Sequence, residues 1–351
     1  MSSVSQGDSS ALPSLVEMRA ALEALTETAD AATQLQELVM LGLDNLPLPG
    51  SGRTLQRWQT LAVVAEHSLS LAKLYEGHTD ALAIFAELDH ITASSTTATW
   101  GMWAAEALNQ RVLIQSSGEG MVKLNGTKCW CSGAPGVSHG LLTAWYADGR
   151  GPQLVVVAMR QSGVGISSDA WMAVGMGQST SVDVTFSHAD AHLVGGVGDY
   201  LHRPGFWQGG AGVAACWYGG AMVLGMALHE ALSALPAAAR GPFKLAALGK
   251  VDLWLESTAA LLRDAAQWVD DNPVADASGT ALRVRLAAEA CATHVLDEAG
   301  RALGAAAFCR NARFARAAAD LPVFVRQSHA ERDFAALAER IISSVERPWS
   351  L

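Results

Sequence analysis

The chain has 351 residues, of which 50% are hydrophobic and 17% charged, and this balance excludes an intrinsically disordered protein. Its formal net charge of −10 would repel phosphate backbones, so we expect no nucleic-acid partner. The five cysteines are odd in number and have no C-x-x-C spacing, which predicts no disulfide framework, no metal site and reduced thiols in the cytoplasm.

The N-terminal part of the chain divides into two regions. Residues 1–13 are polar and Ser-rich without an apolar core, which predicts a disordered start and not a signal peptide. From residue 14 to residue 99, apolar residues recur at spacings of three and four, with a Pro- and Gly-rich interruption near residue 50. This pattern predicts an N-terminal helical domain over 14–99.

Residues 100–203 predict a middle β domain, a small sandwich or barrel, because short β-type runs alternate with turn residues. The runs are 112–115, 121–124, 128–132, 141–146, 154–159 and 182–186. Asn125 and Gly126 both accept a positive φ, so the pair predicts a tight hairpin turn and a new strand from Thr127.

Residues 204–351 predict a C-terminal helical domain, with punctuation by Gly, Pro and Asn between the helices. The expected helices are 209–235, 242–269, 279–303 and 333–345. The segment 209–228 carries no charge and is long enough to cross a bilayer. Because it is rich in Gly and Ala and lacks a flanking basic cluster, we predict a buried, closely packed helix and no membrane span.

The stretch V-K-L-N-G-T-K-C-W-C-S-G-A-P-G in the β domain is the most informative part of the chain. Period-2 alternation predicts Cys129 and Cys131 on one face of a strand and Lys128, Trp130 and Ser132 on the other. A large indole beside a hydroxyl, at a strand end that opens into a Gly-rich loop, would suit an aromatic cofactor. The alternative is a half-buried strand with a core Trp.

K-C-W-C-S-G resembles the K-x-W-I-T/S-x-G strand of the acyl-CoA dehydrogenase superfamily, in which the Trp lies against the flavin and the Ser or Thr bonds near its reactive nitrogen. This resemblance implies that Trp130 and Ser132 contact FAD. It also implies an α+β multidomain fold: an N-terminal helical region, a middle β-barrel or sandwich, and a C-terminal four-helix bundle.

Four further segments resemble family motifs in the right order. A-A-E resembles the T-E-P strand entry, V-G-M-G-Q-S-T the M-G-x-R-x-S/T segment, R-G-P-F the R-x-x-F helix start whose Arg reaches the cofactor diphosphate of a neighbouring subunit, and A-L-G the L-G-G turn near the adenosine. The cofactor contacts that these matches imply are Glu106, Ser179, Thr180, Arg240, Phe243 and Gly304.

Two departures from the family bear on function. After Glu106 the family continues P-x-x-G-S-D, but this chain has A-L-N-Q-R, so flavin and diphosphate contacts are missing. The family's catalytic Glu, in a Y-E-G segment, is also absent. In the comparable region, His329 and Glu331 are the only nearby candidates for a catalytic base, and the alternative is that both are solvent-facing polar residues.

Three functions therefore stay open. The chain is an FAD-dependent oxidoreductase taking hydride from an acyl-thioester-like substrate such as an acyl-CoA, a flavin monooxygenase of the same fold with a His in the comparable region, or a non-catalytic binding or scaffold protein that has lost the flavin. Long Ala- and Gly-rich helices with few charges, together with the resemblance, predict a homodimer or homotetramer.

Overall fold

The computed structural model describes residues 12–26, 29–88, 97–107, 110–118, 121–167, 171–344 and 349. Residues 1–11 of the predicted disordered start lie outside this set. The N-terminal region is helical, as predicted: α1 (Leu15–Ala24), α2 (Ala31–Met40), α3 (Thr54–His67) and α4 (Leu69–Glu87). Ser14 and Glu17 form a capping box at α1, and Asp30 and Ser68 cap α2 and α4 through their side chains.

The middle domain is a β-barrel. Its strands are β1 (Trp100–Trp103), β2 (Val112–Gly118), β3 (Met121–Cys131), β4 (His139–Tyr146), β5 (Pro152–Ala158), β6 (Val164–Ile166) and β7 (Val182–Val194). The strand order is β1-β4-β2-β3-β7-β5, and the additional pairing of β4 with β5 closes the ring. Strands β1 and β2 run parallel to β4, and the other pairs are antiparallel. Closure leaves few unpaired edges.

The hairpin predicted at Asn125-Gly126 is wrong. Strand β3 continues through both residues and pairs with β2 and β7 on either side. The register with β7 shifts between Leu124 and Asn125, and Gly126 has φ 123°. A Cβ on Gly126 would lie 2.3 Å from the carbonyl oxygen of Arg111. The glycine therefore serves a β-bulge and a close strand approach, which need the same backbone freedom as a tight turn.

A second bulge breaks the predicted alternation of side chains at Lys128, whereas Cys129 and Cys131 are buried and Trp130 is exposed, as the alternation predicts. The register between β3 and β7 shifts again between Lys128 and Cys131, and Trp130 has φ 56°. Lys128 is consequently 1% exposed, whereas Trp130 is 54% exposed. The two side chains do not share a face, because the extra residue reverses the period-2 pattern.

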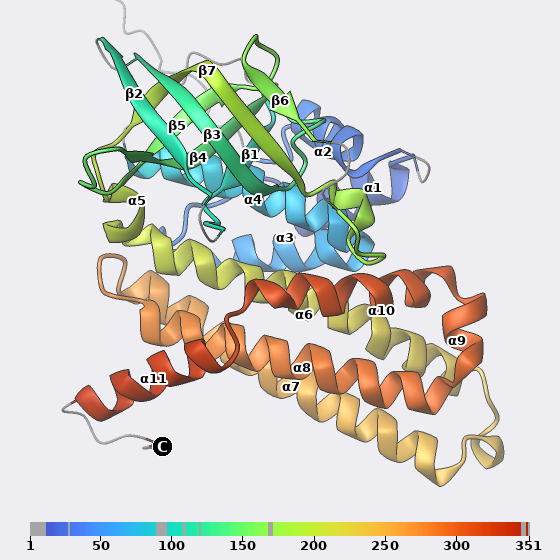
Figure 1. The fold of residues 1–351 in the computed structure, drawn as a ribbon. Helices are drawn as coiled ribbons and strands as arrows, with labels where there is room; N and C mark the ends of the chain where they lie inside the picture. Colours follow the sequence, from blue (N-terminus) through green and yellow to red (C-terminus); the bar gives the residue numbers. More distant parts are fainter. Residues whose placement is uncertain are drawn as a thin grey trace, which may run out of the picture.

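The C-terminal domain contains α5 (Asp199–His202), α6 (Gly205–Ser233), α7 (Pro242–Asp271), α8 (Ser278–Leu303), α9 (Ala305–Arg310), α10 (Ala312–Phe324) and α11 (Glu331–Ser343). Helices α6, α7, α8 and α10 form the four-helix bundle beneath the barrel (Figure 1). The fourth member is α10, which the sequence analysis did not anticipate, and not the predicted 333–345 helix. That segment forms α11, which packs against α8 at the edge of the bundle.

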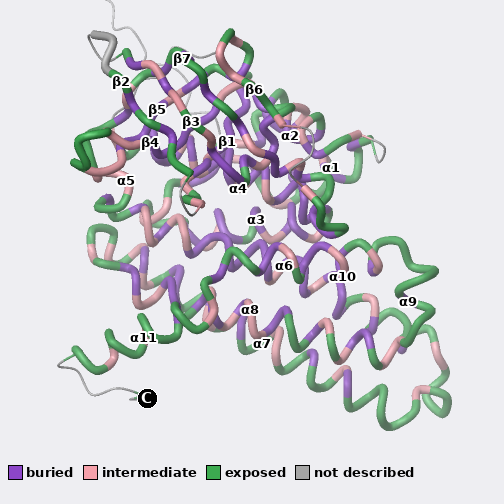
Figure 2. Tube along the Cα trace, in the orientation of Figure 1, coloured by how far each residue is buried: buried purple, intermediate pink, exposed green. Residues whose placement is uncertain are grey.

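Helix α6 is the central helix of the core (Figure 2). By length and composition it could cross a membrane, but 78% of its most apolar window is buried inside the fold. A Cβ on Gly219 would lie 2.3 Å from the carbonyl oxygen of Ala62 in α3, so the two backbones touch. The prediction of a buried, closely packed helix is confirmed.

Candidate functional site

The end of β3 presents an indole beside a chain of hydroxyl groups. Trp130 lies exposed at the second bulge, and the turn after β3 begins at Ser132. Ser132 Oγ lies 2.7 Å from Ser181 Oγ, which lies 3.0 Å from Ser179 Oγ, and Ser179 Oγ donates to the Met176 carbonyl at 2.7 Å. We call Ser132, Ser181 and Ser179 the serine chain. Two predicted site residues, Ser132 and Ser179, are thus brought together through Ser181.

The segment that carries Ser179 has an uncommon backbone. The 3-10 turn η1 (Gly177–Ser179) is flanked by Met176 and Thr180, both in the left-handed region. Thr180 is half-buried, and the Ser179 carbonyl accepts from the Gly133 amide at 2.8 Å. This backbone bond fastens the segment to the turn that follows β3.

Glu106 is engaged by a buried lysine. Lys128 Nζ donates to Glu106 Oε1 at 2.7 Å and to Thr143 Oγ1 at 2.8 Å, and Thr143 Oγ1 donates to the same carboxylate at 2.7 Å. Burial lowers the pKa of Lys128, and the hydrogen bond to Glu106 partly offsets that change. The structure therefore gives Glu106 the part of a counter-ion, and its contact with a flavin stays a prediction.

Three other predicted contacts lie at the far end of the bundle, where α7 begins and α8 ends (Figure 1). Arg240 Nε donates to the carbonyls of Leu232 and Leu235, both at 3.1 Å, and so caps the end of α6. Phe243 is 89% exposed, and Gly304 ends α8 with φ 68°. In the described part of the chain, no hydrogen bond or ion pair joins these three residues to the serine chain.

The two candidate bases lie where α10 leads into α11. His329 Nδ1 is 3.2 Å from Asp333 Oδ1, and the His329 amide donates to Asp333 Oδ2 at 3.1 Å. The His329 side chain is 64% exposed, whereas Asp333 is buried. Glu331 is exposed at the start of α11. Asp333 thus orients His329, a role that the sequence analysis missed although four-residue spacing at a helix start is its signal.

A half-buried arginine holds this connection against the bundle. Arg285 of α8 donates through Nη1 to the Gly210 carbonyl of α6 at 2.9 Å and through Nη2 to the Gln327 carbonyl at 3.1 Å. Its guanidinium also lies over the Trp217 ring, 5.2 Å from the centroid. Through Arg285, the segment that carries His329 is therefore fixed to α8 and α6.

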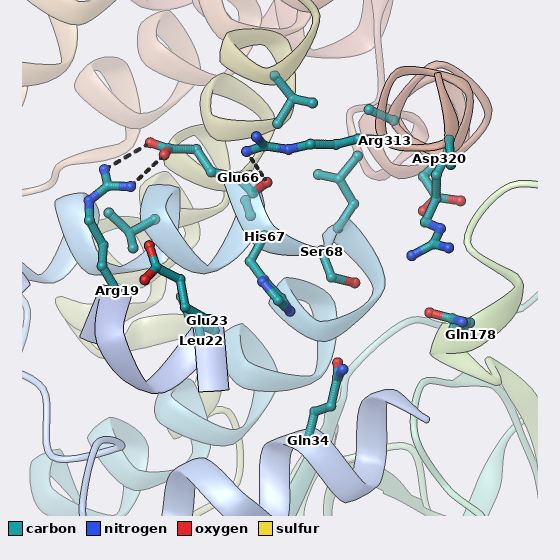
Figure 3. A pocket seen from close by; sticks show the side chains of 17 residues that line it. Arg19, Leu22, Glu23, Gln34, Glu66, His67, Ser68, Gln178, Arg313 and Asp320 are labelled. Atoms are coloured by element: carbon teal, nitrogen blue, oxygen red, sulfur yellow. Dashed lines mark hydrogen bonds and ion pairs between the residues drawn. The ribbon is translucent and has the colours of Figure 1, made fainter. Parts of the chain in front are cut away.

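A cavity of about 550 Å³ lies between α1, the corner of α3 and α4, η1 and α10 (Figure 3). Its charged lining residues are Arg19, Glu23, Glu66, Arg313, Arg316 and Asp320. Arg19 pairs with Glu66 at 2.8 Å. Basic and acidic groups are equally represented, so the lining favours neither an anion nor a cation. None of the predicted site residues lines this cavity.

The described residues contain no group of three or more His, Cys, Asp or Glu side chains placed to hold a metal. Neither protein-family models nor curated proteins match the sequence. Solved structures do: the chain has the acyl-CoA dehydrogenase-like fold over nearly its whole length. The resemblance seen in the sequence is confirmed at the level of the fold.

Three of these structures illustrate the range of enzymes that share the fold. KijD3, solved with FMN and a dTDP-linked amino keto sugar, is 18% identical, covers 96% of this chain and 92% of its own, and has a TM-score of 0.77. TdsC from Paenibacillus sp. A11-2 is a dibenzothiophene monooxygenase that was solved with FMN and indole. It is 18% identical, covers 95% of this chain and 94% of its own, and has a TM-score of 0.75. Butyryl-CoA dehydrogenase from Megasphaera elsdenii is 14% identical, covers 88% of this chain and 90% of its own, and has a TM-score of 0.75. Identities this low establish the fold alone.

Proposed function

We propose that this protein is a flavin-dependent oxidoreductase of the monooxygenase type, which binds FMN and a small organic substrate in the cytoplasm. The observation that carries the proposal is the His329–Asp333 pair in the segment between α10 and α11. A dehydrogenase would need a carboxylate base there. The described residues 325–330 contain no carboxylate, and Glu331 projects from the exposed start of α11.

The end of β3 suits a flavin ring. The exposed indole of Trp130 offers a flat apolar surface, and the Ser132 hydroxyl offers a donor and an acceptor next to it. A bound flavin would accept two electrons and, once reduced, would react with oxygen. No G-x-G-x-x-G motif supports a nicotinamide instead.

Two features favour FMN over the FAD implied by the sequence resemblance. Arg240, the residue matched to the diphosphate ligand, already donates to two carbonyls of its own α6 cap. The segment after Glu106 also lacks the family's P-x-x-G-S-D contacts. FMN has no diphosphate or adenylate, so it needs no ligand at Arg240 and would lose only the flavin contacts of the missing segment. KijD3 and TdsC, both solved with FMN, agree with this choice.

His329 is the residue that would move a proton. Because Asp333 occupies its Nδ1, the Nε2 atom is left to give a proton to the substrate or to receive one from it. The exposure of the imidazole lets it exchange that proton with solvent. Asp333 would fix the ring orientation, in the manner of a carboxylate behind a catalytic His.

The test begins with the visible spectrum and the cofactor released on denaturation, where FMN supports the proposal and FAD contradicts the choice of flavin. The protein is then supplied with reduced FMN, oxygen and a panel of small aromatic and sulfur compounds. We expect His329→Ala and Asp333→Asn to keep the flavin and to slow product formation by about 10² or more, the usual contribution of a general acid or base.

Glu331→Gln is the matched control, since it removes a neighbouring exposed carboxylate, and it should leave the rate unchanged. Anaerobic bleaching of the flavin by an acyl-CoA would support the dehydrogenase function in place of ours. Failure to bind any flavin after reconstitution would reject both enzymes and favour a binding or scaffold role.

A further inference from the structure

Segment 175–181 carries two of the three members of the serine chain. Its backbone conformation is one that needs support from the surrounding structure. Met176 and Thr180 have φ values of 57° and 41°, a region that L side chains rarely adopt. Only the single turn η1 separates them. A backbone of this kind persists when the surrounding structure constrains it.

Helix α10 supplies that constraint. The Met176 amide donates to Asp320 Oδ1 at 2.5 Å, and Asp320 is only 6% exposed. A Cβ on Gly175 would lie 2.0 Å from the Ala319 carbonyl oxygen, so the segment touches the backbone of α10 one residue away. Trp171 Nε1 also donates to the Gly175 carbonyl at 3.1 Å.

Within the described part of the protein, the buried carboxylate of Asp320 accepts a hydrogen bond from this one backbone amide. Burial raises its pKa, while the Met176 amide and the nearby Arg316 act in the opposite direction. Among the residues that the structure describes, no ion pair compensates the charge of Asp320. A buried acid that costs free energy and contacts a left-handed residue is well suited to hold that residue in place.

We propose that Asp320 is a positioning residue that holds segment 175–181 through the Met176 amide and thereby sets Ser179 and Ser181 beside Ser132. Its effect on catalysis rests on the proposed function, because it assumes that the serine chain contacts the flavin. Helix α10 continues through η3 (Val325–Gln327) to His329. Helix α10 therefore contacts segment 175–181 and leads, through η3, into the segment that carries His329.

The test compares Asp320→Ala with Asp320→Asn, whose side-chain oxygen still accepts from the Met176 amide. We expect Asp320→Ala to raise amide hydrogen exchange within 176–181 and to weaken flavin binding by about tenfold, the equivalent of one lost hydrogen bond. Asp320→Asn should keep both within about twofold of wild type, since the acceptor remains. Asp264→Ala, at an exposed carboxylate of α7, is the control and should change neither.

If Asp320→Ala does not fold, Asp320→Ser, which is too short to reach the amide, takes its place. Wild-type exchange in 176–181 together with wild-type flavin affinity would overturn the proposal. So would an even rise in exchange across α10 and the barrel with unchanged affinity of the folded fraction, which is the mark of a general loss of stability. If the wild-type chain binds no flavin, the proposed function fails, and a local rise in exchange still supports the positioning role.

Discussion

Trp130 is exposed at a backbone irregularity near the end of its strand. The bulge between Lys128 and Cys131 rotates the indole outward while its neighbours Cys129 and Cys131 stay buried. Natural strands conserve bulges where a side chain must be re-aimed. An exposed indole contributes little to the stability of the barrel, and its place next to Ser132 agrees with the proposed flavin contact.

We predict that Trp130→Ala weakens flavin binding by about fivefold or more and changes the free energy of unfolding by less than about 0.5 kcal/mol, because stacking is lost while little buried area changes. Trp130→Phe should retain part of the affinity. Flavin titration and urea denaturation measure the two quantities, with the exposed Trp349→Ala as a control. A large loss of stability with unchanged affinity would assign Trp130 to the core.

Lys128, unlike Trp130, is buried, and its ammonium group needs a counter-ion. We predict that Glu106→Gln destabilises the fold by about 2 kcal/mol at pH 7, since it leaves that charge without a counter-ion. Glu331→Gln serves as the exposed control.

This loss depends on pH in a defined direction. Burial lowers the pKa of Lys128 in the folded state below its unfolded value, and losing the Glu106 hydrogen bond lowers it further. Between the two pKa values the unfolded chain binds more protons, so stability rises with pH. The deficit of Glu106→Gln should therefore narrow from pH 7 toward pH 10 in denaturant titrations. A deficit that widens instead would show that Lys128 is not the source.

At the scale of elements, the sequence predicted well what depends on local pattern. The succession of helices, strands and helices followed from the change between 3.6-residue and 2-residue periodicity. The fourth bundle helix was missed because Pro322 and clustered Ala and Arg obscured the pattern of α10. The Asn125-Gly126 hairpin failed because positive φ serves a turn or a bulge alike, and only the pairing of β3 with both neighbours decides between them.

The contact of α6 with α3 gives a prediction of its own. Gly219→Ala should destabilise the fold by about 1–3 kcal/mol, because the added methyl group would meet the Ala62 carbonyl. Gly249→Ala in α7, where a Cβ meets nothing within 4 Å, should instead stabilise by about 0.5–1 kcal/mol through helix propensity. Urea midpoints compare the two. Equal effects would mean that α6 can move away from α3 without cost.

For the whole molecule, the surface of α7 predicts self-association. Phe243, Leu245 and Leu253 are 89%, 47% and 68% exposed along one helix, so this helix leaves several large apolar side chains in water. We expect sedimentation to give a dimer or tetramer of the 36.8 kDa chain at micromolar concentration, and Leu253→Glu to shift it toward the monomer. A wild-type monomer under these conditions would contradict the prediction.

The site was harder to predict than the fold. Trp130 and Ser132 could be proposed from the sequence because they lie within a short motif, and His329 because it lies in the region where the family has its catalytic Glu. The roles of Ser181, Asp320 and Asp333 come from contacts with other segments or from the shape of a helix start. Local periodicity carries no information about such contacts.

The apolar character of α6 has a consequence for how the protein is made. The helix emerges from the ribosome before α8, the element that packs most extensively against it, and the face that α8 covers stays open until residues up to Leu303 have been added. In that interval the nascent chain resembles a membrane segment and is open to capture by chaperones or by other unfinished chains. A chain that stops at Asp271 should therefore pellet on centrifugation when translated in a chaperone-depleted extract, whereas the full chain stays in the supernatant. Equal recovery of both in the supernatant would mean that α3, α4 and α7 alone are enough to shield the helix.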